Sequence, residues 1–72
     1  MSSVNEHINN PKNSDSVDNN STEFATLEDA ETFYTNIVAK YSANPSWTYQ
    51  GETAYTTTYT SGIHTAVVTL VP

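Results

Sequence analysis

The sequence contains no cysteine, so neither a disulfide bond nor a zinc site with thiolate ligands can stabilise this chain of 72 residues. It has no apolar run near the roughly 20 residues that a membrane-spanning helix requires. Its opening residues, MSSVNEHINNPKNS, show neither the basic start nor the apolar core of a signal peptide. These absences predict a small cytoplasmic protein without a membrane-spanning segment.

Arginine is absent as well, and Lys12 and Lys40 stand against eight Asp and Glu residues, which gives a net charge of −6. Proteins bind phosphate backbones and anionic membrane surfaces through clusters of Lys and Arg. The composition therefore argues against direct binding of nucleic acid and against adsorption to a membrane. Two interpretations of the acidity stay open: it keeps a small protein soluble, or it attracts a basic surface on a protein partner.

Residue types that carry catalysis or bind metal are scarce. His7 and His64 are the only histidines, there are two glycines, and no phosphate-binding loop, dinucleotide fingerprint or G-x-S-x-G motif occurs. A metal site needs three or four suitably spaced ligands, and a contact between His64 and Glu52 would provide only two. The sequence predicts a protein that is not an enzyme and that has no cofactor and no metal.

Residues 1–22 are rich in Asn and Ser, and their apolar residues Val4, Ile8 and Val17 are isolated from one another. These positions match neither the period of a helix nor that of a strand. Such a segment buries too little apolar surface to offset the entropy that it would lose on ordering. We therefore predict a disordered Asn/Ser-rich tail over residues 1–22 and a small α+β domain over residues 23–72.

Residues 27–42 have the pattern of an amphipathic helix. Apolar residues recur there at spacings of three and four, which places on one stripe Leu27, Ala30, Tyr34, Ile37, Val38 and Tyr41. Thr26 is a good N-cap, and Asp29 follows it three residues later. The helix should end before Pro45, because a residue that precedes proline, here Asn44, disfavours the helical conformation.

The residues after Pro45 alternate with the period of two that is typical of strands. We expect a short strand over residues 46–50, and a hairpin within AYTTTYTSGIHTAVVTL whose turn is Ser61 and Gly62. In that register Tyr59 faces His64, the opposite face is mostly threonine, and one half-apolar face carries Thr53, Tyr55, Thr57, Tyr59, His64, Ala66, Val68 and Leu70. The predicted fold class is α+β, in which the disordered N-terminal tail precedes one amphipathic helix packed on a three-stranded antiparallel sheet (α-β-β-β).

The aromatic residues of the expected strands have two interpretations. Trp47, Tyr49, Tyr55 and Tyr59 either supply core area in a chain with few leucines or form a stacking platform for a sugar. A platform for nucleic-acid bases would also need a positive groove, which this composition does not provide. We favour the core.

Two functions fit these observations. The first is a small acidic protein that binds and inhibits or regulates another protein, a class to which small phage- or plasmid-encoded inhibitors belong by size and charge. Its partner would be a basic protein such as one that handles nucleic acid, and its contact residues would be Glu28, Asp29, Glu31 and Glu52. The alternative is a structural or self-assembling protein of the virion, surface or precursor type. It would form a homodimer or a larger assembly through its apolar C-terminal strand, residues 64–72.

Overall fold

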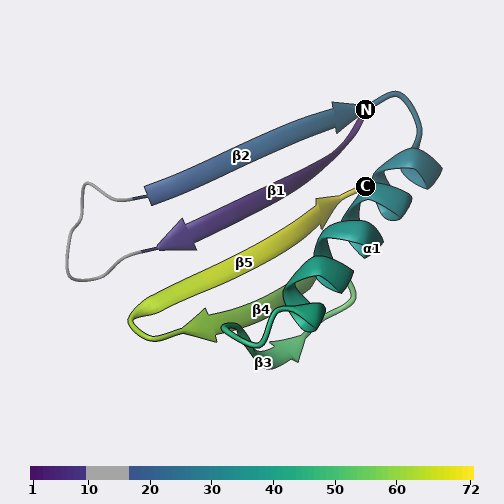
Figure 1. Ribbon diagram of the computed structural model, residues 1–72. Helices are drawn as coiled ribbons and strands as arrows, with labels where there is room; N and C mark the ends of the chain where they lie inside the picture. Colours follow the sequence, from purple (N-terminus) through teal and green to yellow (C-terminus); the bar gives the residue numbers. More distant parts are fainter. Residues whose placement is uncertain (10–16) are drawn as a thin grey trace.

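One helix packs on one face of a five-stranded antiparallel sheet (Figure 1). The computed structural model describes residues 1–9 and 17–72. The elements in chain order are β1 (Ser2–Asn9), β2 (Val17–Phe24), α1 (Leu27–Ala43), β3 (Thr48–Glu52), β4 (Thr56–Ser61) and β5 (His64–Val71). The strand order in the sheet is β2-β1-β5-β4-β3. The radius of gyration is 12.3 Å, close to the roughly 11 Å of a compact chain of this length. Among the described residues, no helix has both the length and the apolar character to cross a membrane.

The expected disordered tail over residues 1–22 is wrong, because its described residues form two strands of the sheet. Strand β1 pairs with β2 along its whole length and with β5 along all but its first residue. Residues 10–16 of the expected tail lie outside the described part of the chain. The expected three-stranded α-β-β-β fold is therefore also wrong: the element order is β-β-α-β-β-β, in a mostly-sheet α+β fold.

Alternation along β1 explains why this segment folds with so few apolar residues. Its even-numbered side chains face the helix: Ser2 and Val4 are buried, and Ile8 packs against the core. Glu6 occupies the remaining even position, so a charged residue interrupts the apolar period that a strand with one buried face normally shows. The apolar side chains beside β1 come from its neighbour β5, on which Ala66, Val68 and Leu70 are buried.

Helix α1 forms as expected and ends one residue later, at Ala43. The expected N-cap is also confirmed, because the backbone N–H of Asp29 donates a hydrogen bond of 3.2 Å to Oγ1 of Thr26. Most of the apolar stripe packs against the sheet, but Leu27 at its beginning is 43% exposed. The buried residues of the helix are Ala30 and Tyr41.

The β4–β5 hairpin is present, but its register differs by two residues from the expected one. Gly62 and Ile63 form the turn, and Tyr59 pairs with Ala66 rather than with His64. Gly62 has a φ of +60°, which fits the glycine at the first central position of a type II′ turn. Because the shift is an even number of residues, the same side chains still face the helix. Thr53 and Tyr55 are exposed, whereas the expected core face is buried at Thr57, Tyr59, Ala66, Val68 and Leu70.

Strand β3 begins two residues later than expected and forms one edge of the sheet. Its register with β4 shifts between Tyr49 and Gly51, so Gln50 is the extra residue of a β-bulge. Gly51 lies at this bulge with a φ of +134°, a conformation that residues with a side chain rarely adopt. Trp47 precedes the strand and packs against the core, which favours the core interpretation for this aromatic residue.

Hydrogen bonds between α1 and β4 satisfy the polar groups of the core. The hydroxyl of Tyr59, a residue that is 1% exposed, donates to the backbone oxygen of Val38 at 3.2 Å and lies 2.9 Å from Oγ of Ser42. The hydroxyl of Tyr34 lies 2.6 Å from Oγ1 of Thr57. Each such bond contributes about 1 kcal/mol. They fix the position of the helix over the sheet.

Replacement of Val4 by alanine tests whether β1 belongs to the core. Val4 is 1% exposed, so we expect Val4→Ala to lower the free energy of unfolding by about 2 kcal/mol through lost burial and a residual cavity. Val71→Ala is the matched control, because Val71 is 40% exposed. This substitution should lower the free energy of unfolding by less than about 0.5 kcal/mol. Urea unfolding followed by circular dichroism measures both. Equal and small effects would contradict the placement of β1.

Candidate functional site: a groove beside the helix

A groove of about 750 Å³ lies between α1 and strand β1. Its charged lining residues are Glu6 on β1 and Lys40 on α1, and two amides, Asn36 and Asn44, line it as well. The rest of the lining is apolar or aromatic and consists of Ile8, Phe33, Ile37, Tyr41 and Trp47. The groove thus combines an apolar wall with one carboxylate on the strand and one ammonium group on the helix.

The groove exists because α1 crosses the sheet at an angle to the β1–β2 hairpin. Near its beginning the helix packs against the end of β2, where the rings of Phe24 and Phe33 have centroids 5.1 Å apart. Its later turns bond to β4 through Ser42 and Tyr59. The helix therefore moves away from the far half of the hairpin, which extends beyond it in Figure 1. That half of β1 carries Glu6 and Ile8.

Tyr41 connects the core to the carboxylate of the groove. Its ring stacks on Tyr59, with centroids 5.0 Å apart and planes at 15°, and meets Trp47 edge to face at 5.1 Å. Its hydroxyl donates a hydrogen bond to Oε2 of Glu6. Burial raises the pKa of Tyr41 well above its ordinary value, and the hydrogen bond and the negative charge of Glu6 raise it further. The neutral hydroxyl is therefore held as a donor to Glu6.

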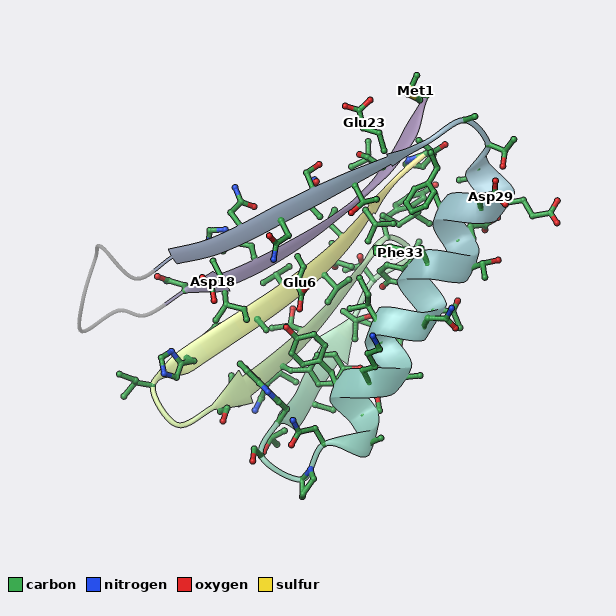
Figure 2. The ribbon with its side chains drawn as sticks, turned by 45° about the horizontal axis from the view of Figure 1, so that its top comes forward. Met1, Glu6, Asp18, Glu23, Asp29 and Phe33 are labelled. Carbon is green, nitrogen blue, oxygen red and sulfur yellow. The ribbon has the colours of Figure 1, made fainter. Side chains whose placement is uncertain are left out.

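A second carboxylate, that of Asp18, lies next to the groove on β2. Ile8 pairs with Asp18 and Glu6 pairs with Asn20, so all four side chains lie on the helix side of the sheet. Asp18 and Glu6 are thus diagonal neighbours, at a Cα separation of about 7–8 Å. The charge of Asp18 also contributes to the raised pKa of Tyr41. Figure 2 shows Asp18 and Glu6 on the hairpin and Phe33 on the helix that faces it.

The residues that the sequence indicated as a contact surface lie elsewhere. Glu28, Asp29 and Glu31 are exposed in the first two turns of α1, whereas Glu52 is exposed on the edge strand β3. Glu52 accepts a hydrogen bond of 2.9 Å from the hydroxyl of Tyr49, which raises the pKa of that tyrosine. The three helical carboxylates lie within five residues of one another on α1, whereas Glu52 lies on a different element, β3. None of the four lines the groove.

Sequence reasoning missed the carboxylate and hydroxyl groups of the site: Glu6 and Tyr41 line the groove, and Asp18 lies on β2 beside it. Glu6 and Asp18 fall in the segment that the composition indicated as disordered, and Tyr41 was assigned to the apolar stripe of the helix. One signal was available: Val4, Glu6 and Ile8 alternate with polar residues, as expected for a strand with a carboxylate on its buried face.

The chain matches no protein-family model, no curated protein and no solved structure. Among the described residues, no group of three or more His, Asp or Glu side chains is arranged to hold a metal ion. His7 is exposed on an odd-numbered position of β1, on the sheet face opposite the groove. The geometry of the groove is thus the available guide to function.

The raised pKa of Tyr41 makes the stability of the fold depend on alkaline pH. Above pH 10 the unfolded chain ionises this tyrosine at its ordinary pKa of 10.0, while the folded chain keeps the proton. The contribution of the neutral Tyr41 hydroxyl to the free energy of unfolding is therefore complete below pH 10 and is lost as the pH rises above it. We expect Tyr41→Phe to reduce this alkaline loss of the free energy of unfolding, measured by urea unfolding at several pH values.

At neutral pH, Tyr41→Phe should cost about 1–2 kcal/mol, because Glu6 loses its hydrogen-bond donor. Tyr49→Phe is the matched control, since the bond of Tyr49 to Glu52 is exposed to solvent and screened. If the free energy of unfolding falls equally steeply above pH 10 in the wild-type protein and in Tyr41→Phe, then Tyr41 is not held in the neutral form.

Proposed function

We propose that this chain is a small acidic, non-enzymatic protein of the cytoplasm that binds a basic surface of another protein and thereby inhibits or regulates it. The observation that carries the proposal is the groove between α1 and β1, in which Glu6 lies among apolar and aromatic side chains. Interfaces between proteins commonly combine apolar and aromatic contact area with a few oriented polar groups.

The charge distribution supports a basic partner. Seven of the eight Asp and Glu residues belong to the described part of the chain, which contains one of the two lysines, Lys40. Such an excess of one sign accelerates association with a surface of the opposite sign. The carboxylates of Glu28, Asp29 and Glu31 contribute to this long-range attraction from the beginning of α1, while the groove would supply the close contact.

The chemistry of the groove supports binding rather than catalysis. Glu6 is its one carboxylate, and the hydroxyl that bonds to it belongs to Tyr41, whose raised pKa disfavours ionisation to a nucleophile. Nucleophilic catalysis would require a group that ionises near neutral pH, which the raised pKa of Tyr41 disfavours. The arrangement of Glu6 and Tyr41 instead holds a carboxylate in a fixed orientation.

The order of strands in the sheet argues against the alternative of self-assembly through the C-terminal strand. Strand β5 pairs with β1 on one side and with β4 on the other, so its backbone is occupied on both edges. The edges of the sheet are β2 and β3 instead. Strand β3 is short and bulged, and β2 carries Asp18 and Glu23, which would repel a second acidic copy. We therefore prefer capture of a basic partner.

A pull-down from lysate with tagged full-length chain tests the proposal when three baits are compared: wild type, Glu6→Gln and Glu31→Gln. Both variants remove one negative charge, but only Glu6 lines the groove. We expect wild type and Glu31→Gln to capture the same basic protein at about 50 mM salt and to release it at about 500 mM, where charges are screened within a few ångströms. Glu6→Gln should capture at least about tenfold less.

The mass of each bait in solution completes this test. A wild-type bait that captures no protein and has the mass of two or more chains would overturn the proposal in favour of self-assembly. Capture that is equally strong for Glu6→Gln and lost for Glu31→Gln would place the contact on the helix instead of the groove.

A further inference from the structure

The lining of the groove specifies the shape and charge of what it can hold. Ile8, Ile37 and Phe33 are partly buried and form an apolar passage between the helix and the strand. Glu6 lies beside them, on a strand position whose neighbours on β5 are buried and apolar. A ligand that complements both features has a positive group at the end of an apolar stem, as long basic side chains do.

We infer that the groove takes one arginine side chain of the protein partner, an inference that rests on the proposed function. Oε2 of Glu6 already accepts the Tyr41 hydroxyl, which leaves Oε1 of Glu6 as the carboxylate acceptor in the groove. Asp18 does not line the groove, but its position on β2, diagonal to Glu6, adds a second negative charge beside it. A guanidinium group carries five N–H donors in a planar fork and can bond to two carboxylates at once. Its plane also stacks on aromatic rings, and the partly buried Trp47 lines the groove.

Lysine fits this site less well than arginine. An ammonium group is a compact and strongly hydrated point charge without the planar face that stacks on aromatic rings. Its three N–H donors rotate freely, so it lacks the fixed planar fork with which a guanidinium group is held by carboxylates. The groove therefore discriminates between the two basic side chains by geometry rather than by charge.

The occupant belongs to a different protein rather than to a second copy of this one. The chain contains no arginine and has only two lysines. Two copies with a net charge of −6 each also repel one another. The ligand chemistry of the groove and the composition of the chain thus agree on a basic partner.

Lys40 lines the same groove and opposes the incoming charge. It is exposed near the end of α1, so its ammonium group adds a positive charge beside the proposed position of the guanidinium. We expect Lys40→Gln to tighten the binding of an arginine ligand, whereas Glu6→Gln weakens it. A nonspecific effect of net charge would also give opposite responses to these two substitutions. Glu31→Gln is therefore the control, because it changes the net charge as Glu6→Gln does but lies outside the groove.

Blocked tripeptides provide the test: Gly-Arg-Gly, Gly-Lys-Gly and the uncharged Gly-Gln-Gly, titrated into the full chain. Trp47 is the only tryptophan and lines the groove, so its fluorescence reports binding there, and calorimetry gives an independent dissociation constant. We expect the arginine peptide to bind more tightly than the lysine peptide, and the glutamine peptide not to bind. Glu6→Gln should weaken the binding of the arginine peptide about tenfold, since it removes a charge-assisted hydrogen bond. Glu31→Gln should leave this binding unchanged.

An oligolysine peptide, added as a fourth probe, separates the failure of this inference from the failure of the proposed function. Equal binding of the arginine and lysine tripeptides, or arginine binding that does not depend on Glu6, overturns the inference. If an oligolysine peptide then binds in a salt-dependent way, acidic capture of a basic partner still stands. If no basic probe binds while circular dichroism shows every variant folded, both proposals are wrong.

Discussion

The pairing of β1 with β5 is the constraint on which the rest of the structure depends. This ladder joins the β1–β2 hairpin to the sheet that β3, β4 and β5 form, and no disulfide bond assists it. It also sets Val4 opposite Leu70 and Glu6 opposite Val68, which makes one continuous surface for α1 to cover. Without it, β5 would be an edge strand, and the helix would pack on a sheet of three strands instead of five.

Tyrosine has an unusual share of the core and shapes its chemistry. Tyr59 and Tyr41 are buried and stacked on each other, yet each hydroxyl needs a partner because an unpaired buried hydroxyl is costly. Tyr59 finds its partners on α1, within the core. Tyr41 finds Glu6 at the boundary between helix and sheet, and in this way a packing residue orients a carboxylate at the groove.

Local signals were sufficient to predict part of this fold. Thr26, the apolar stripe and Pro45 defined the helix to within one residue, because capping and periodicity act over a few residues. The faces of β4 and β5 were also predictable, although the turn was displaced by one residue: Gly62 suits a two-residue turn both after Ser61 and before Ile63. An error of two residues in register does not change which side chains are buried.

The N-terminal strands were not predictable by the same reasoning, for a physical reason. Strand β1 is stabilised by β5, whose residues lie at the other end of the sequence, and its own apolar pattern is interrupted by Glu6. Glu6 is also the central residue of the candidate site, so the same break in the apolar pattern hid both the strand and the site from sequence analysis. Charge alone drew attention to Glu28, Asp29, Glu31 and Glu52, which the structure places outside the groove.

The central position of β5 also sets the order in which the chain can fold. Helix α1 and the β4–β5 hairpin are made of near neighbours in sequence and can form early, whereas β1 must wait for the strand that is synthesised last among the described elements. Until then the β1–β2 hairpin has only itself to pair with, and an isolated two-stranded hairpin is marginally stable in water. The scarcity of apolar residues in β1 and β2 thus protects the growing chain from aggregation. Unpaired strands rich in Asn, Ser and carboxylates have little tendency to aggregate before β5 becomes available.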